Sequence, residues 1–358
     1  MQTDMHYYGT WAMARAAGLS HATATTIATA AQFVDDNAGD VNLEFEDGGR
    51  VETVATAHHT TDVKNVATGD QRRVWVPFHF MPGNEGEDFT ERLVCRKNSA
   101  IVREAVDHAL SLHQRVYAAE LMGVVAHVYA DTFSHYGFSG VSSRRNRVDN
   151  DSFEFHAVDS EIEVYIRGKA NKFFEDYGEE SMWGNIKSWF GEQLSGALGH
   201  AAVATYPDRP YLDWSFTYEW PEAISARHDN PTTFHEGCAA LHAMFRRFAE
   251  LRPDLTAGEG RDFAVISERV ADILRLQLNM DGRIDAWKRA AEDGAFGPDE
   301  SIPHYSEDDW HGDRKQAAAS KNSLVVRDLP VYRFWQAAAN HRTYVLKDLL
   351  PHHGLIVD

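Results

Sequence analysis

The sequence predicts a mostly α-helical fold with one small β-hairpin and long loops. Three observations predict it. Apolar residues recur at helical spacing over most of the chain, strand-like alternation is confined to one short stretch, and clusters of proline and polar residues separate the periodic segments. The chain has 358 residues and shows no repeat and no obvious linker. We therefore expect a single domain over residues 1–358, with a polar excursion around residues 295–328.

The N-terminal region is expected to form two helices in succession. Residues 6–18 have a helical pattern that ends at Gly18, and Ser20 is a plausible N-cap for a second helix over residues 21–37. An N-cap serine accepts a hydrogen bond from a free amide of the first turn. These segments carry some of the candidate site residues discussed below.

The next region is expected to contain the hairpin. Residues 41–54 alternate apolar and polar around an Asp-Gly-Gly turn at residues 47–49, which is typical of a β-hairpin and predicts the only sizeable strand pair. Residues 74–83 are apolar and contain two prolines, so we expect an extended buried segment or a loop there.

The rest of the chain is expected to alternate helices with loops. Residues 99–138 carry two apolar stripes, which predict two helices in series. Residues 140–151 read as a polar loop, and residues 205–231, with four prolines, as mostly loop. Further helices are expected at residues 157–177, 183–204, 232–251, 262–294 and 330–350.

The composition limits the classes of partner. The net charge is −19, which opposes tight electrostatic binding to nucleic acid or to an anionic membrane surface. No stretch of 18 apolar residues is present, so no integral membrane segment is expected. The first residues resemble no signal peptide, so the expected location is the cytoplasm, with leaderless export left open. The two cysteines exclude a disulfide framework.

The central candidate site lies in the segment GVVAHVYADTFSHYGFSG. His127, Asp131 and His135 are spaced four apart, so on one helix they share a face and rise by about 6 Å per step. A carboxylate between two imidazoles on an apolar helix is costly to bury unless it is paired or binds a cation. We expect one or more divalent metal ions here. A hydrogen-bonded His–Asp–His network without metal is the alternative.

One helix cannot complete a coordination sphere, so other segments must contribute. His6 opens the first predicted helix. Asp35 and Asp36 end the second helix, where the helix dipole disfavours carboxylates and thus points to another role. His59 and Asp62 follow in an HHTTD segment.

These motifs resemble the superfamily of zinc-dependent phospholipases C and fungal single-strand nucleases. Segments such as FVDD, PFHFMPG and LGHAAVATYPDRPYLDW resemble even more an uncharacterised bacterial family related to it. The resemblance is scattered over roughly residues 4–215. It implies an α-helical protein with one to three divalent metal ions, zinc first, that hydrolyses phosphodiester bonds.

The resemblance also implies a ligand set. Asp35, His59, His127 and Asp131 would hold one zinc ion, and Asp131 would bridge to a second that His6 joins. His135 would begin a third site. His200 and Asp208 are favoured as its remaining ligands, and His156 with Asp159 is the alternative.

The chain departs from the pattern of that superfamily at three points, one of which is that the terminal His–acid pair is not cleanly present. The superfamily's classical members bind metal through the amine of a processed N-terminal tryptophan, so this ligand is expected to be missing here or replaced by Asp4. The gap between Asp131 and His135 is also shorter than in those members. The number and identity of the metal ions therefore stay open.

The function predicted from these residues is a metal-dependent phosphoester hydrolase, of phospholipase C type, that uses a metal-bound hydroxide. Asp36, Asp62 and His79 are the candidates for orienting the attacking water, and Arg209 is a candidate for contacting a phosphate oxygen. The acidic charge favours a lipid or small-molecule substrate over nucleic acid. The alternatives are a single-strand nuclease or other phosphodiesterase, and a non-catalytic interaction protein with a structural metal site.

Overall fold

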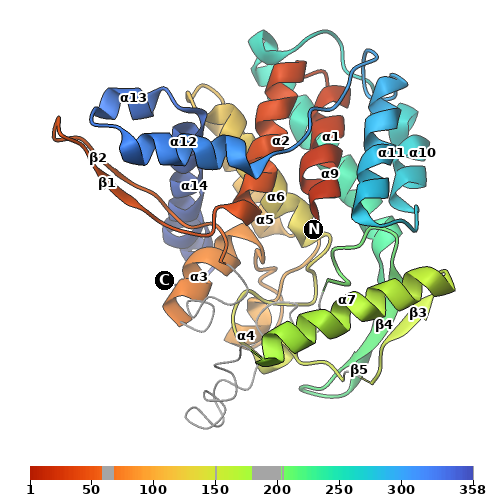
Figure 1. The fold of residues 1–358 in the computed structure, drawn as a ribbon. Coiled ribbons are helices and arrows are strands. Elements are labelled where there is room, and N and C mark those ends of the chain that lie inside the picture. Colours follow the sequence, from red (N-terminus) through yellow and green to blue (C-terminus); the bar gives the residue numbers. More distant parts are fainter. Residues whose placement is uncertain (59–67, 150, 180–202, 204, 358) are drawn as a thin grey trace.

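The computed structural model describes residues 1–58, 68–149, 151–179, 203 and 205–357, and these are mostly helical with a few strands (Figure 1). The predicted helical class is thus confirmed in its main feature. Helix α6 (Ala118–Thr132) lies at the centre. It packs against α2 (His21–Asp36), α5 (Ala100–Ser111), α9 (Asn230–Leu251) and α14 (Pro330–Tyr344).

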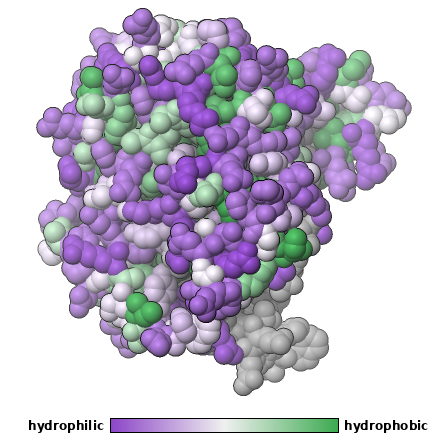
Figure 2. All heavy atoms as spheres, turned by 180° about the vertical axis from the view of Figure 1, so that it is seen from behind, coloured by the Kyte–Doolittle hydropathy of each residue, from purple (hydrophilic) through white to green (hydrophobic). Residues whose placement is uncertain are grey.

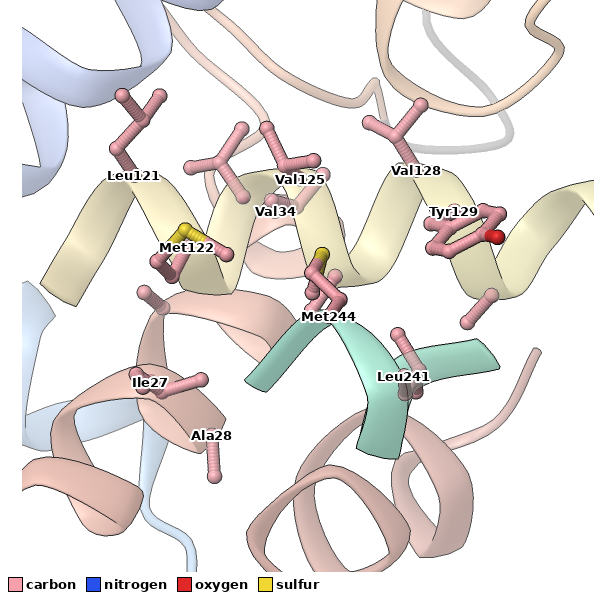
Figure 3. Packing of buried hydrophobic residues seen from close by; sticks show 14 of the residues in the cluster. Ile27, Ala28, Val34, Leu121, Met122, Val125, Val128, Tyr129, Leu241 and Met244 are labelled. Carbon is pink, nitrogen blue, oxygen red and sulfur yellow. The ribbon is translucent and has the colours of Figure 1, made fainter. Parts of the chain in front are cut away.

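Apolar contacts between α2, α6 and α9 form the middle of the core. Figure 3 shows Met122 of α6 beside Ile27 of α2, and Met244 and Leu241 of α9 approaching the same helix. Burying these side chains stabilises the fold by roughly 1.5–3 kcal/mol each. The same contacts fix α6 in position, and α6 carries the central candidate residues.

The first two helices largely follow the prediction. A π-helical turn (Asp4–Gly9) leads into α1 (Thr10–Ala16), and the chain turns at Gly18, whose φ is 98°. Glycine adopts this left-handed conformation without the steric cost that a side chain brings. The Ser20 hydroxyl accepts a hydrogen bond from the amide of Thr23, so the predicted N-cap of α2 is confirmed.

The strands differ from the prediction. The expected hairpin forms from β1 (Asn42–Glu44) and β2 (Arg50–Glu52). A second, three-stranded antiparallel sheet joins β3 (Glu154–His156), β4 (Asp213–Tyr218) and β5 (Ile224–Asp229) in that order. The expectations of a single strand pair and of a mostly loop segment at 205–231 were therefore wrong.

The reason lies in the alternation along β4. Trp214 and Phe216 point into a second hydrophobic cluster, while their neighbours are less buried. This period of two is typical of a half-buried strand, but four nearby prolines concealed it. Helix α7 (Ser160–Glu179) runs across the sheet in Figure 1.

The segment before the central helices is also helical. Helix α3 (Thr68–Phe78) replaces the extended segment that was expected from residue 74 onward. Pro77 lies in its last turn, where the missing amide costs only one hydrogen bond near the helix end. The short helix α4 (Phe89–Arg92) follows. Residue 79 comes directly after α3, which matters for the site.

The C-terminal third contains more helix than predicted. The expected helix at 262–294 is two helices, α10 (Phe263–Leu274) and α11 (Met280–Glu292), and the segment 295–328 contains α12 (Glu307–Ala319) and α13 (Ser323–Arg327). Trp310 and Val326 are buried, so the expected excursion is packed. The chain ends with a π-helical turn (Val345–Leu349) and α15 (Leu350–His352).

Two of the earlier expectations concern other parts of the molecule. The helix expected at residues 183–204 falls almost entirely outside the described residues. In the part of the chain that is described, no helix is both long enough and apolar enough to cross a bilayer. Figure 2 shows a face that is mainly hydrophilic, with scattered hydrophobic residues.

Candidate metal centre

Histidine and aspartate side chains from five segments meet at the C-terminal end of α6. His127 and Asp131 lie on this helix, and both are fully buried. His135 lies in the turns after the helix, not on it as expected. Its amide nevertheless donates to the carbonyl of Asp131 over 2.7 Å, so the helical spacing continues far enough to bring the two side chains together. Their Nδ1 and Oδ2 atoms are 3.5 Å apart.

One nitrogen of His127 is held by the backbone of α2. Its Nδ1 lies 2.8 Å from the carbonyl oxygen of Ala31. A carbonyl only accepts, so Nδ1 must carry the hydrogen. The other nitrogen, Nε2, lies 3.2 Å from Oδ2 of Asp131 and 3.1 Å from Nδ1 of His79. In the neutral ring, Nε2 therefore presents a lone pair to this cluster.

His79 is arranged in the same way. Its Nε2 donates to the carbonyl oxygen of Thr56 over 2.9 Å, which leaves Nδ1 facing Oδ2 of Asp131 at 3.3 Å. The sequence predicted only a water-orienting role for His79, but its position is that of a nitrogen donor. The chain turns here because α3 has just ended.

His135 is the third such ring. Its Nδ1 donates to the carbonyl oxygen of His79 over 2.9 Å, and its Nε2 lies 3.1 Å from Oδ1 of Asp208. The ring of Phe80 stacks on it with centroids 4.8 Å apart. Asp208 also accepts a hydrogen bond from the hydroxyl of Ser134.

His6 and Asp35 complete the group. The His6 ring stacks on His127 at 3.8 Å between centroids, and its Nε2 lies 3.1 Å from Oδ1 of Asp131. Neither ring nitrogen of His6 has a hydrogen-bond partner of adequate geometry. Oδ1 of Asp35 lies 3.8 Å from Nε2 of His127 and 3.9 Å from Nδ1 of His79.

The amino group of Met1 also lies in this cluster, close to the middle of the molecule (Figure 1). It is 2.8 Å from Oδ1 of Asp131 and 3.2 Å from Oδ1 of Asp208. An amine thus lies at a position where the sequence predicted none, or Asp4 in its place. Asp4 instead forms a buried ion pair with Arg283, with Oδ2 and Nε 2.6 Å apart.

The charges of the cluster are strongly coupled. Burial alone would raise the pKa of Asp131, but the charges of His135, the Met1 amine and His127 hold it well below its usual value. Burial would lower the pKa of the Met1 amine, but the surrounding aspartates raise it to about 11. In the absence of another cation, this amine is therefore protonated and neutralises part of the carboxylate charge.

The histidines respond differently to the same surroundings. Burial and the charges of His127 and the Met1 amine lower the pKa of His6 to about 3. Burial likewise lowers the pKa of His79. Against the effect of burial, Asp131 and Asp35 raise the pKa of His127. Burial thus favours the unprotonated form of His6 and His79 beside the carboxylates, which is the state in which imidazoles bind metal.

Two sets of donors are compact enough to share an ion. His6, His127 and Asp131 form one set, and Asp35, His79 and His127 form the other, with the donor atoms of each set within 4.8 Å of one another. The structure thus brings His6, Asp35, His127, Asp131, His135 and Asp208 together, as the sequence predicted. Their role as ligands stays a prediction.

The other predicted site residues lie elsewhere. His59, Asp62 and His200 fall outside the described residues. The alternative pair is away from the cluster, because His156 bonds the Ser215 hydroxyl and the amide of Asp159 bonds Gln277.

Asp36 has its hydrogen-bond partner outside the group of histidines and aspartates described above. Its carboxylate accepts a hydrogen bond from the hydroxyl of Tyr305, a residue that the sequence did not single out. Burial raises the pKa of Asp36 to about 6. The predicted role of Asp36 in orienting water stays a prediction.

Comparison with known proteins gives one match. The model of a family of unknown function, DUF6765, matches residues 1–349. No curated protein and no solved structure matches the chain.

Proposed function

The chain belongs to the family of unknown function DUF6765, and we propose that it is a metal-dependent phosphoester hydrolase. The metal centre is the cluster around Asp131. The reaction class rests on the resemblance of the motifs to the zinc-dependent phospholipases C and single-strand nucleases. The acidic net charge of −19 favours a lipid or small-molecule phosphoester over nucleic acid.

The observation that carries the proposal of a metal is the orientation of three histidines. His127, His79 and His135 each donate one ring N–H to a backbone carbonyl and direct the other nitrogen at a neighbouring donor atom. Lone pairs that face one another over about 3 Å repel unless a proton or a metal ion lies between them, and a metal ion can serve all three rings at once. Metal-binding histidines typically use the second nitrogen in this way to fix the ring.

The donor set fits a divalent ion of the zinc type. Imidazole nitrogens and carboxylate oxygens are the ligands that zinc prefers where cysteine is absent. His6, His127 and Asp131 are proposed for one ion, and His79 with Asp35 for a second. His135 and Asp208 lie beside them, and the Met1 amine is a further nitrogen donor once it has lost its proton.

A divalent ion held here would supply Lewis acidity and would lower the pKa of a water molecule toward neutrality. The side chains of the protein would do the rest. The backbone carbonyls of Ala31, Thr56 and residue 79 keep the three rings in one tautomer. Asp35, whose side chain is 34 % exposed, is the carboxylate of the cluster most open to solvent, so we expect substrate to approach from its side.

The first experiment measures metal. The purified chain, its His127→Ala and Asp131→Ala variants, and a matched His235→Ala control would be titrated with zinc after chelation. His235 lies on α9 and bonds Ser267, away from the cluster. Loss of a residue that only hydrogen-bonds a metal ligand lowers metal affinity roughly 10- to 100-fold. We expect each site variant to lose more zinc affinity than this, and the control to bind zinc as the unaltered chain does. Equal binding by all four would contradict the metal centre.

The second experiment measures hydrolysis. The zinc-loaded chain would be offered bis-p-nitrophenyl phosphate, p-nitrophenyl phosphorylcholine and single-stranded DNA, with the Asp131→Ala variant as a control. We expect cleavage of the small phosphodiesters, abolished in the variant. Tight zinc binding without cleavage of any substrate would favour a scaffold with a structural metal.

A further inference from the structure

In the part of the chain that the structure describes, Arg209 is a buried cation without a carboxylate partner. It follows Asp208 directly, and its side chain is among the buried charged groups, with an exposed fraction of 4 %. Nη2 donates to the Thr205 hydroxyl over 3.1 Å, and Nη1 lies 3.5 Å from the Tyr211 hydroxyl. Among the described residues, the Nε hydrogen has no acceptor. The two terminal nitrogens thus each have one neutral partner, and the third nitrogen, Nε, has none.

The other buried arginines in the described part of the chain are neutralised. Arg283 pairs with Asp4 at 2.6 Å and also binds the side chain of Gln2, and Arg15 pairs with Glu300. A buried charge without a counter-ion costs several kcal/mol. Among the described residues, the guanidinium of Arg209 meets only neutral groups, which are two hydroxyls and the Tyr165 ring 5.6 Å away. A buried cation without a counter-ion is typical of a group that an anionic ligand neutralises.

The backbone of Arg209 is held by a hydrogen bond and follows directly on Asp208, which contacts the cluster. The Asn230 side chain donates to the carbonyl oxygen of Arg209 over 2.8 Å. On one side, Asp208 contacts His135 and the Met1 amine. On the other side, the Tyr211 ring lies under the guanidinium of Arg283. Arg209 therefore stands next to residues that the proposed hydrolase uses.

We propose that Arg209 binds the anionic phosphate group of the substrate, a role that rests on the proposed function. The guanidinium of arginine offers a planar fork of donors that matches two phosphate oxygens. The unpaired Nε hydrogen supplies one arm of such a fork. With a net charge of −19 the protein as a whole repels anions, so a desolvated cation beside the metal centre would supply local attraction.

The binding experiment uses inorganic phosphate as the probe. Calorimetric titration would compare the unaltered chain with Arg209→Met, Arg209→Lys and a matched Arg227→Met control, each with zinc and after chelation. Arg227 is an exposed arginine paired with Asp213. We expect Arg209→Met to weaken phosphate binding about tenfold or more, while the zinc stoichiometry and the melting temperature of the chain are retained. Unchanged phosphate binding in Arg209→Met would overturn the proposal.

The lysine variant keeps the test decisive if Arg209→Met does not fold. Lysine retains the charge but not the fork, so a loss of threefold or more in phosphate affinity supports the proposal, and an affinity equal to that of the control overturns it.

Kinetics separate this proposal from the proposed hydrolase. We expect Arg209→Met to lower kcat/KM at least tenfold for bis-p-nitrophenyl phosphate and for p-nitrophenyl phosphorylcholine. An effect on the choline ester alone would identify a lipid headgroup as the source of the phosphate. Hydrolysis that is unaltered by Arg209→Met overturns the role of Arg209 and leaves the hydrolase standing. If phosphate binding depends on Arg209 but the chain cleaves none of the substrates, the anion site is supported and the hydrolase is overturned.

Discussion

The buried histidines of this protein fall into two kinds that differ in what their second nitrogen meets. His127 and His79 direct it at other donor atoms in the cluster. His341, on α14, donates to the carbonyl oxygen of Pro77 and packs against Phe78. His228 stacks on Tyr136 with centroids 4.1 Å apart, and its Nδ1 has no partner. Burial alone therefore does not identify a ligand, whereas the direction of the free nitrogen does.

His228 predicts an acid-sensitive contribution to stability. Burial, together with the charge of Lys97, lowers its pKa to about 3 in the folded chain, against about 6.5 when unfolded. The unfolded state takes up the proton first, so stability is lost as the pH falls below 6.5, and the loss continues to about pH 3. Between pH 7 and pH 5, protonation of His228 in the unfolded state should lower the free energy of unfolding by about 2 kcal/mol.

The His228→Phe variant removes this titration while keeping an aromatic ring in the stack. Denaturant unfolding would measure how much stability each chain loses between pH 7 and pH 5. The loss should be about 2 kcal/mol smaller in the variant than in the unaltered chain. An exposed histidine, His352, serves as the control, and His352→Phe should leave the pH dependence unchanged. A His228→Phe variant with the full acid loss would contradict the assignment.

Single residues also show where sequence reasoning reaches its limit. The choice of Asp208 over Asp159 agrees with the geometry, because a proline-fixed turn brought Asp208 to His135. The orientation of His79 toward Asp131 could not be predicted, because it depends on the carbonyl of Thr56, which only the folded chain brings near. The Met1 amine was discounted because the sequence does not show that the chain returns its first residue to the end of α6.

At the scale of elements, the close approach of α2 and α6 places Asp35 beside His127. The backbone carbonyl of Ala31 bonds His127 directly, which requires the two helices to lie in near contact. Gly123 makes this possible, because a Cβ there would lie 2.4 Å from the carbonyl oxygen of Ile27. A real Cβ does not come so close to backbone, so a side chain at this position must push the helices apart.

The Gly123→Ala variant should therefore be destabilised despite the better helix propensity of alanine. Overpacking of a tight core costs about 1–3 kcal/mol, and zinc affinity should fall with it because Asp35 and His127 separate. Gly312→Ala on α12 is the matched control, since nothing lies within 4 Å of its would-be Cβ. There the substitution should stabilise the chain by about 0.5–1 kcal/mol. Equal melting temperatures for both variants would show that α2 and α6 are not tightly apposed.

The elements that the sequence predicted well are helices with a long run of apolar residues at helical spacing and a clear N-cap. Helices α2, α5 and α9 satisfy both conditions, with Ser20, Ser99 and Asp229 as their side-chain caps. Helix α6 has the periodicity but no side-chain cap. Strands β4 and β5 were missed because each is six residues long and prolines surround them. A short alternating run has too few residues to outweigh the loop signal of the prolines. The strand conformation is decided only by packing against α7 and the second hydrophobic cluster.

At the scale of the whole molecule, the candidate metal centre lies where two hydrophobic clusters meet. The larger cluster contains α6 and most other helices, and the smaller one contains Phe80, Tyr206, Tyr211 and the inner face of β4. His127 and Asp131 come from the first, whereas Asp208 lies in the chain between two residues of the second. Carboxylates from both sides lie close together here around the Met1 amine, so the metal-free protein carries an electrostatic cost where its two apolar clusters meet.

This position predicts that removal of the metal destabilises the entire chain. A ligand that binds only the folded state stabilises it by RT ln(1 + [L]/Kd), about 4 kcal/mol when zinc is a thousandfold above its Kd. For a protein of this length, that free energy corresponds to a melting temperature about 5 °C higher. Scanning calorimetry of the zinc-loaded chain should thus show a single transition that shifts down by about this amount with a chelator. The His127→Ala variant should melt at the same temperature with and without the chelator. If a chelator lowers the melting temperatures of the unaltered chain and of the variant equally, the stabilising ion binds elsewhere.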